Sequence, residues 1–352
     1  MWKRWMWRGV LLLGSLALGV VALAWWLWSS MALDAGPRAP DPDWPALVES
    51  DPPRGRILAV VSSTATHPHN GRSAGYELTE LARAYALFLA HGYAVDIASP
   101  QGGKAPMKLD DSLVGADRAF LADPLAKARR EATLRLADVD PSRYAAVYFV
   151  GGKGTLYDFA DDPDIARIGA AIWAQGGVIA AVCHGPAALL GIRLPDGRAL
   201  VAGRQVAAFS NAEEIFLMPD AARVLPFLLQ DRLLAAGARY SEGPRYLEHV
   251  VVDDRLITGQ NPWSTWLTAE ATLRALGVTP QARLPTAEEH SVRVLRALHD
   301  QGIEAAWRVR AERPADRHLL AMHAVVAAME WRLFDALRLH ALARPHAVDH
   351  GH

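Results

Sequence analysis

The chain has 352 residues, of which 51% are hydrophobic and 21% charged, a composition that predicts a folded core and excludes wholesale disorder. Its 37 lysines and arginines nearly balance its 38 aspartates and glutamates, so it lacks the basic excess of a nucleic-acid binder. Cys183 is the single cysteine, which excludes an intramolecular disulfide, a CxxC redox pair and a multi-cysteine metal site.

Residues 1–30 predict a transmembrane anchor. The uncharged run 9–28 has 20 residues, which as a helix would cover about 30 Å, the thickness of the hydrocarbon core. Tryptophans flank the run and basic residues precede it, so the positive-inside rule predicts a single-pass protein of the inner membrane with a periplasmic body. A cleaved signal peptide is the alternative. Residues 31–54, rich in proline and aspartate, predict an extended tether.

Residues 55–283 alternate between short apolar runs and amphipathic stretches, as strands separated by helices do. The predicted strands lie near 56–62, 93–98, 144–150, 178–182, 205–209, 247–252 and 255–258. The predicted helices lie near 75–90, 115–121, 124–136, 163–175, 184–190, 224–236 and 262–276. This order predicts an α/β fold with a mostly parallel, doubly wound, flavodoxin-like sheet. Ligands of such sheets bind beyond the carboxyl ends of the strands.

Residues 284–352 contain no strand-like run and predict a helical C-terminal extension. Apolar residues between 319 and 337 form a one-sided stripe, which we expect to pack against the main domain. A dimer contact or a face on the membrane surface is the alternative. Eight of the thirteen histidines lie in this extension at irregular spacing, so we expect solvated side chains rather than a metal site. The string THPH at 66–69 likewise predicts a loop.

The strand predicted at 178–182 runs directly into Cys183, which is followed by His184, Gly185 and Pro186. A tight turn between a strand and a helix is the geometry of a nucleophile elbow, which projects one side chain above the sheet edge. The positive end of the following helix favours the thiolate, and His184 can carry protons near neutral pH. A buried structural cysteine is the alternative interpretation.

Four sequence motifs resemble those of a known protein family, and they occur in the same order along the chain as in that family. They are GYELTELA at 75–82 with the following GYAVDIASPQGG, GGKGTLYD at 151–158, AVCHGPAAL at 181–189, and LITGQNP at 256–262. In these strings the chain resembles the ThiJ/PfpI superfamily, which has a class I glutamine amidotransferase-like fold. It is most similar to the branch of cofactor-independent glyoxalase III enzymes and related stress chaperones. The resemblance covers roughly residues 55–277.

The resemblance implies a set of catalytic residues. Cys183 matches the family nucleophile, and His184 matches its neighbouring histidine. Glu80 matches a helix glutamate that reaches the sulfur. Glu214 matches the acid that orients the histidine, with Glu213 as the alternative in register.

The resemblance also implies an oxyanion hole, formed by the backbone amides of Gly152 and His184. Gly151, Lys153 and Gly154 would line the site. Lys153 departs from the family pattern, which commonly has histidine there, and we expect it to lower the pKa of the cysteine or to alter substrate choice. The alternative for the helix glutamate is an exposed carboxylate paired with an arginine three residues further on.

Together with these residues, the resemblance implies a glyoxalase III-like hydro-lyase that converts 2-oxoaldehydes such as methylglyoxal to 2-hydroxy acids without metal, nucleotide or glutathione. The same groups would serve an amide or peptide hydrolase or a protein deglycase. The third hypothesis is a membrane-tethered holdase chaperone or a redox sensor with an accessible, low-pKa cysteine. The expected partners are an aldehyde or modified protein substrate and, through residues 9–28, the lipid bilayer. A homodimer is a further option.

Overall fold

The computed structural model describes residues 41–68, 71–109 and 112–346, together with Gly19, Ala22, Trp25 and Ser29. The chain divides into two compact units, Asp43–Arg283 and Leu284–His352 with Met1–Pro42. Among the described residues, no helix is long and apolar enough to cross a membrane. The predicted anchor at 9–28 lies almost wholly outside the described residues and stays a prediction.

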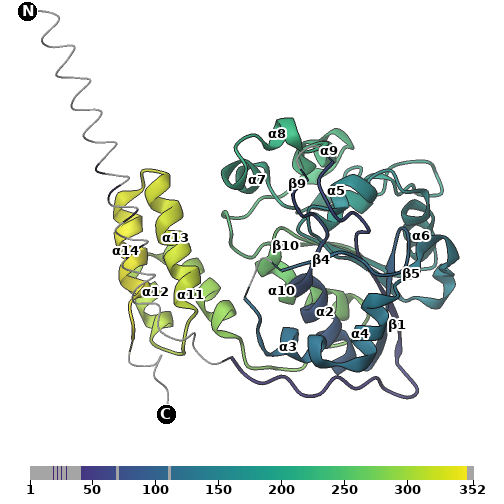
Figure 1. Ribbon diagram of the computed structural model, residues 1–352, viewed down its shortest axis with the longest axis horizontal. Helices are drawn as coiled ribbons and strands as arrows, with labels where there is room; N and C mark the ends of the chain where they lie inside the picture. Colours follow the sequence, from purple (N-terminus) through teal and green to yellow (C-terminus); the bar gives the residue numbers. More distant parts are fainter. Residues whose placement is uncertain are drawn as a thin grey trace, which may run out of the picture. The chain divides into compact units, whose positions relative to one another are not determined.

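A seven-stranded sheet forms the centre of the unit Asp43–Arg283 (Figure 1). Its strands are β1 (Gly55–Val60), β3 (Tyr93–Ser99), β5 (Leu134–Arg135), β6 (Ala146–Phe149), β7 (Val178–Val182), β10 (Val250–Asp253) and β11 (Leu256–Gly259). They lie in the order β10-β11-β7-β6-β1-β3-β5, and among them β10 and β11 form the antiparallel pair while the others pair in parallel. The strands β3-β1-β6-β7-β11 follow the flavodoxin-like order, which confirms the predicted α/β fold.

Helices cover both faces of this sheet (Figure 1). On one face α2 (Leu78–Ala90) packs beside α10 (Thr265–Ala275) and α3 (Gly115–Ala122), which is followed by α4 (Pro124–Glu131). The other face carries α6 (Pro163–Ala174), the 3₁₀ helix η3 (Gly185–Leu190) and α9 (Leu229–Ala235). The shorter elements are α5 (Thr155–Asp158), α7 (Asn211–Leu217), α8 (Ala221–Val224), and the strand pairs β2 (Tyr76–Glu77) with β4 (Met107–Lys108) and β8 (Gln205–Val206) with β9 (Arg239–Tyr240).

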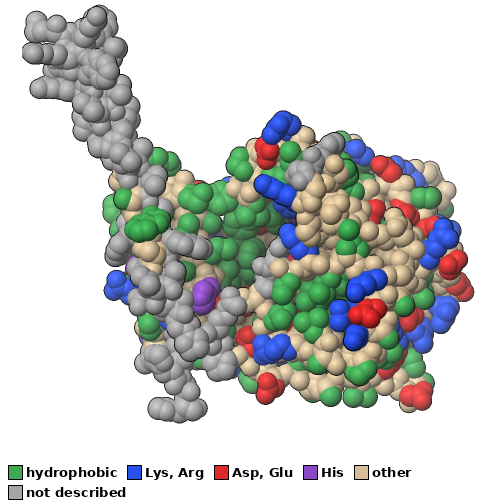
Figure 2. Space-filling model, viewed as in Figure 1, with side chains coloured by type: hydrophobic (Ala, Val, Ile, Leu, Met, Phe, Trp, Pro, Cys, Tyr) green, Lys and Arg blue, Asp and Glu red, His purple; other side chains and the backbone are tan. Residues whose placement is uncertain are grey.

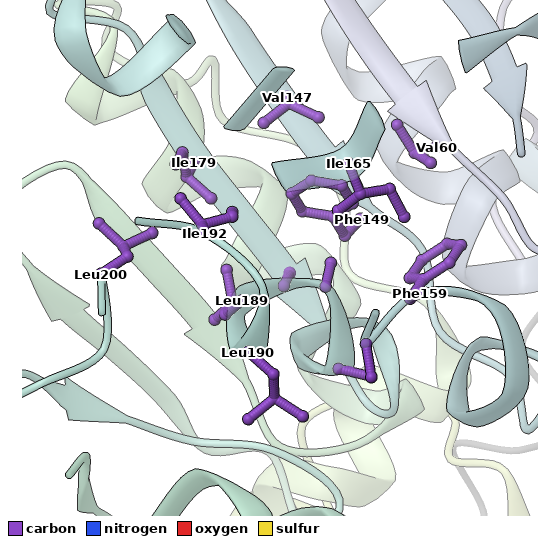
Figure 3. Packing of buried hydrophobic residues seen from close by; sticks show 14 of the residues in the cluster. Val60, Val147, Phe149, Phe159, Ile165, Ile179, Leu189, Leu190, Ile192 and Leu200 are labelled. Atoms are coloured by element: carbon purple, nitrogen blue, oxygen red, sulfur yellow. The ribbon is translucent and has the colours of Figure 1, made fainter. Parts of the chain in front are cut away.

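A hydrophobic cluster fills the space between the sheet and the helices α6 and η3 (Figure 3). Phe149 of β6 and Ile179 of β7 point into it and meet Ile165 of α6 and Leu189 of η3, each at most 1% exposed. Burying a side chain of this size contributes roughly 1.5–3 kcal/mol. The cluster therefore holds β6 and β7 firmly, and the loops that leave their carboxyl ends start from fixed positions.

Three predicted elements differ from the structure. The helix expected at 124–136 ends at Glu131, because the chain then forms β5 on the edge of the sheet. The helix expected at 224–236 is two helices, α8 and α9, since Pro226 lacks the amide hydrogen that a continuous helix needs. The strand expected at 205–209 is the short β8, which pairs with β9 outside the main sheet.

Part of the expected tether packs against the α/β unit. Trp44 stacks on Trp266 of α10, with ring centroids 5.5 Å apart. Glu49 forms an ion pair of 2.8 Å with Arg129 of α4. The compact unit therefore begins at residue 43 rather than at residue 55.

The C-terminal part of the chain forms four described helices, α11 (Ala287–Gln301), α12 (Ile303–Arg310), α13 (Arg317–Met329) and α14 (Leu333–Ala343). The prediction that the apolar residues of 319–337 lie on one continuous helix face was wrong, because a turn separates α13 from α14. Leu319 is 7% exposed, whereas Phe334 is 81% exposed. The expectation of solvated histidines was also wrong for His290 and His340, which are buried.

On the face that Figure 2 shows, basic and acidic side chains are interspersed over the unit Asp43–Arg283, with hydrophobic side chains between them. The near-equal numbers of basic and acidic residues are therefore also mixed in space on this face.

Candidate active site

Cys183 directly follows β7 and has a φ of +59°, in the left-handed region that side chains rarely adopt. Its amide donates to the carbonyl of Gly259 at 2.9 Å, and its carbonyl accepts from the amide of Phe209 at 2.8 Å. Gly185 then fits so closely against the end of β6 that a Cβ there would collide with the carbonyl oxygen of Phe149. This arrangement has the geometry of a nucleophile elbow, in which the surroundings hold a strained residue in place.

His184 links the sulfur to a buried acid. Its Nδ1 lies 3.2 Å from Sγ of Cys183, and its Nε2 lies 2.6 Å from Oε2 of Glu214. The ring also stacks on Phe209, with centroids 4.6 Å apart and 28° between the planes. These three contacts fix the imidazole between the thiol and the carboxylate.

The protonation state of Glu214 determines which ring nitrogen of His184 carries hydrogen. Burial opposes ionisation of Glu214, but the charges of His184 and Lys153 and their hydrogen bonds outweigh it and lower the pKa of this carboxyl to about 2. An ionised carboxylate only accepts hydrogen bonds, so Nε2 is the donor. In the neutral ring Nδ1 therefore has the free lone pair, and it faces the sulfur.

The tertiary structure shows which of the two adjacent acids, Glu213 or Glu214, contacts His184. Glu213 accepts hydrogen bonds from the amide of Ser210 at 3.0 Å and from the side chain of Asn261 at 2.9 Å. The Ser210 side chain accepts in turn from the amide of Glu213, which completes a capping box. Glu213 thus holds the start of α7 in place, and Glu214 reaches His184.

Glu80 reaches the site from the first turn of α2 and is 0% exposed. Its Oε2 accepts a hydrogen bond from the amide of Gly151 at 2.7 Å, and its carboxyl group hydrogen-bonds with the thiol of Cys183. Arg83, the partner in the alternative interpretation, forms a buried ion pair of 3.3 Å with Asp117. The alternative of an exposed carboxylate was therefore wrong.

The surroundings of Cys183 favour the thiol over the thiolate. Burial raises the pKa of this thiol well above its usual value, and Glu80 adds to the increase by its charge and its hydrogen bond. The helix after the elbow is the six-residue 3₁₀ helix η3, and Cys183 is only 4% exposed. The prediction of an accessible, low-pKa cysteine was wrong, because burial outweighs the short helix end. A base must therefore remove the thiol proton before the sulfur can act as a nucleophile.

The loop 151–154 lies against the elbow because its glycines allow close approach. A Cβ at Gly151 would stand 2.8 Å from Cβ of Cys183, and Gly152 has a φ of +102°, which favours glycine. Within the described part of the chain, the amides of Gly152 and His184 donate no hydrogen bond to a protein acceptor. An oxyanion hole needs amides without a protein acceptor, and its formation by Gly152 and His184 stays a prediction.

The same loop also positions a cation. Nζ of Lys153 forms an ion pair with Oε1 of Glu214 at 2.8 Å, and this lysine side chain is 19% exposed. The amide of Gly154 donates to the carbonyl of Gly75 at 3.0 Å, which ties the loop to the segment before β2. Lys153 therefore contacts the acid of the site, whereas the largest influences on the pKa of Cys183 are burial and the acids Glu80, Glu213 and Glu214.

Two neighbours of the site were missed by sequence reasoning. Phe209 stacks on His184, and Tyr148 lies on β6 beneath the site, 0% exposed. The hydroxyl of Tyr148 has no hydrogen-bond partner among the described residues. Burial raises the pKa of Tyr148 well above its usual value, and the charges of Glu80 and Cys183 act in the same direction. No sequence signal separates these two aromatic residues from ordinary core residues.

The segment predicted as a loop at 66–69 contributes one histidine near the site. Nδ1 of His67 lies 2.9 Å from the hydroxyl of Tyr157, and the two rings meet edge to face. Across the described ranges, no group of three or more histidine, cysteine, aspartate or glutamate side chains is arranged to hold a metal ion.

The residues that build this site fall within one known family. Residues 73–274, more than half of the chain, match the DJ-1/PfpI family. The chain belongs to the DJ-1/PfpI family. The matched range contains Glu80, Cys183, His184 and Glu214, and it ends in α10.

Relatives within the DJ-1/PfpI family include several that are named as glyoxalases. Glyoxalase 3 of Candida albicans is 28% identical over 233 residues, which cover 62% of this chain and 97% of that protein. A glutathione-independent glyoxalase of Saccharomyces cerevisiae is 28% identical over 244 residues, 64% of this chain and 98% of that protein.

Solved structures of similar proteins share the fold. The Rapid Encystment Protein 24 kDa of Francisella tularensis aligns with a TM-score of 0.59 and 32% identity, over 63% of this chain and 99% of that chain. Glyoxalase III from Candida albicans aligns with a TM-score of 0.57 and 25% identity, over 63% of this chain and 97% of that chain. The DJ-1/PfpI part of the chain is therefore similar in extent to whole family members.

Proposed function

We propose that this DJ-1/PfpI protein is a glutathione-independent glyoxalase that converts 2-oxoaldehydes such as methylglyoxal to 2-hydroxy acids such as lactate. The continuous contact from Cys183 through His184 to Glu214, with Glu80 also on the thiol, carries the proposal. A thiol with two proton carriers suits addition to an aldehyde followed by proton transfer. The relatives named as glyoxalases support the same reaction class.

The first step adds the thiol to the aldehyde carbon, C1. Nδ1 of His184 takes the proton of Cys183, the S–C1 bond forms, and the electron pair of the C1 carbonyl moves onto its oxygen. The amides of Gly152 and His184 donate to this oxygen. Glu214 stabilises the charged ring of His184. The ring then returns the proton to the oxygen, which gives a hemithioacetal.

The second step moves a hydrogen from C1 to C2. A base, either Glu80 or His184, removes the C1 hydrogen as a proton, the electron pair left behind forms the C1–C2 double bond, and the C2 oxygen takes up a proton, which gives an enediol. The C1 hydroxyl then loses its proton and C2 gains one, which leaves a thioester at C1 and a hydroxyl group at C2. C1 has been oxidised and C2 reduced, so the isomerisation needs no external oxidant or reductant. Water hydrolyses the thioester and releases the hydroxy acid and the thiol.

The test is the loss of methylglyoxal and the appearance of lactate without glutathione, with the full chain purified in detergent. We expect turnover by the wild type and none by Cys183→Ala. Glu214→Gln keeps the size of the side chain and removes its charge, and we expect a loss of about 100-fold, as for other groups that support acid–base catalysis. Undiminished lactate formation by Cys183→Ala would disprove the mechanism.

The same contacts could serve the hydrolysis of an amide, a peptide or a sugar adduct on a protein. Assays of the wild-type protein with an amide substrate and with methylglyoxal separate these reactions. A protein that cleaves the amide and leaves methylglyoxal unchanged is a hydrolase. The raised pKa and 4% exposure of Cys183 disfavour the redox-sensor hypothesis, since oxidation follows thiolate character and access.

A further inference from the structure

The carboxylate of Glu214 is shared between two groups from different parts of the fold. Oε2 lies 2.6 Å from Nε2 of His184, and Oε1 lies 2.8 Å from Nζ of Lys153. The side chains of Glu214 and His184 are 6% and 4% exposed, and that of Lys153 is 19% exposed. Water therefore screens these interactions only weakly.

The balance of charge around His184 matters because Cys183 keeps its proton at rest. A buried carboxylate whose only partner is an imidazole favours the imidazolium form. An imidazolium has no lone pair on Nδ1 and cannot accept the thiol proton. A second cation on the same carboxylate weakens its pull on the ring proton.

We propose that Lys153 is a positioning residue that holds the second oxygen of Glu214 and thereby keeps His184 neutral and oriented as the base for Cys183. This inference rests on the proposed role of Cys183 as the nucleophile, but it concerns the thiol–imidazole pair itself and not the identity of the substrate.

The backbone around Lys153 supports a positioning role. The preceding glycines contact Glu80 through the amide of Gly151 and leave the amide of Gly152 available. The following residue, Gly154, is fixed to the segment before β2. One rigid loop thus carries the contact to Glu80, the predicted oxyanion donor and the cation on Glu214.

Other titratable groups lie near Glu214 and Cys183, and they stay the same in every variant of the test. Glu214 also acts electrostatically on His67 and Tyr157, and it raises the pKa of both. For His67 this increase is smaller than the decrease caused by burial and by Lys153. On the thiol side, Glu80, Glu213 and Glu214 each raise the pKa of Cys183. None of these other residues is changed in the Lys153 variants.

The test uses the single cysteine of the chain. Iodoacetamide alkylates the thiol with assistance from neutral His184, so the rate falls toward acid pH with a midpoint set by that ring. In Lys153→Met we expect the midpoint to rise by ~1 pH unit, because an opposing charge is lost. Lys153→Arg keeps the charge and should restore the wild-type midpoint. Lys127→Met, on the exposed side of α4, is the matched control and should not shift it.

A double-mutant cycle asks whether the effect passes through Glu214. In a Glu214→Gln background, adding Lys153→Met should leave the midpoint unchanged within 0.2 pH units or so, since the shared carboxylate is gone. A midpoint in Lys153→Met at or below that of the wild type would overturn the proposal. An equal shift in both backgrounds would also overturn it, since Lys153 would then act on the ring directly.

The alkylation rate measures the reactivity of the Cys183 thiol without any turnover of aldehyde. The role of Lys153 and the glyoxalase activity can therefore be rejected independently. A shifted midpoint in a protein that leaves methylglyoxal unchanged would support the role of Lys153 and reject the glyoxalase assignment. A glyoxalase whose midpoint is unaffected by Lys153→Met would do the reverse. Thermal unfolding of each variant shows whether it is folded, and the Arg variant provides the comparison if Met destabilises the loop.

Discussion

The carboxyl group of Glu80 accepts a hydrogen bond of 2.7 Å from the amide of Gly151, although 71 positions separate the two residues in the sequence. This bond joins the start of α2 to the end of β6, beside the elbow that holds Cys183. The side chains of the site therefore come from a helix start, a strand end and the helix α7, and contacts with distant parts of the chain hold them in place. Catalysis by such a site depends on this fixed geometry.

Glu80→Gln tests the contribution of this carboxyl to proton transfer. The amide side chain has the same size and can still accept the hydrogen bond from Gly151, but it cannot carry a proton between the carbons of the substrate. We expect methylglyoxal turnover to fall by at least ~100-fold, in the range for loss of a general acid or base. Glu131→Gln, on the exposed end of α4, is the control with the same chemical change and should retain full activity. Activity within threefold of the wild type in Glu80→Gln would contradict this role.

Gly152→Ala tests the steric argument for the loop. A Cβ there would stand 2.6 Å from the carbonyl oxygen of Gly75 and 2.7 Å from the amide nitrogen of Glu77, at a φ of +102°. We expect a loss of several kcal/mol in the free energy of unfolding, roughly 3 kcal/mol, together with lost activity. Gly197→Ala is the matched control, since its φ is +82° but no atom lies within 4 Å of the added Cβ. That change should cost only ~1 kcal/mol, and equal costs in urea denaturation would refute the argument.

The acid dependence of stability tests the ionised state of Glu214. Its pKa is about 2 in the folded protein, against 4.5 without the influence of the fold. Ionised Glu214 therefore stabilises the fold fully above about pH 4.5, and this contribution is lost as the pH falls from there toward 2, by roughly 3 kcal/mol in total. The free-energy difference between the wild type and Glu214→Gln should shrink as the pH falls from 4.5 toward 2 in urea titrations. A difference independent of pH down to 3 would mean that the fold does not lower the pKa of this carboxyl.

Tyr148→Phe removes a buried hydroxyl that has no hydrogen-bond partner among the described residues. Because an unsatisfied buried polar group costs free energy, we expect the variant to be more stable by about 1 kcal/mol. Tyr144→Phe provides the opposite case, since its hydroxyl donates to Asp96 at 3.0 Å and its loss should destabilise the fold by a similar amount. Chemical denaturation of both variants gives the comparison. A clear loss of stability in Tyr148→Phe would show that the hydroxyl has a partner, such as a bound water.

The apolar run 9–28 is expected to anchor the protein in a membrane, and cell fractionation tests this. The full chain should be recovered with the membranes and released by detergent, whereas a chain that starts at residue 41 should be recovered in the supernatant. N-terminal sequencing of the mature protein decides between an anchor and a cleaved signal peptide. Recovery of the intact full chain in the supernatant without detergent would reject the anchor.

The sequence alone was sufficient for the features that depend on local pattern. Apolar runs between amphipathic stretches predicted the parallel sheet, because a strand buried on both faces has to be apolar throughout. The string around Cys183 predicted the elbow, because a strand that meets a tight turn of small residues has few other conformations. These signals lie within a few residues of one another, so they can be read without the fold.

Only the tertiary structure decided the features that depend on distant parts of the chain. Adjacent residues on a helix point about 100° apart, so the choice between Glu213 and Glu214 required the position of α7 relative to β7. The state of the Cys183 thiol depended on burial and on Glu80, which outweigh the local helix end. The pairing of Lys153 with Glu214 joins a loop to the helix α7, 61 residues further along the chain, and no periodic pattern records it. Electrostatic energies follow distance and burial in space, and both are set by packing rather than by sequence separation.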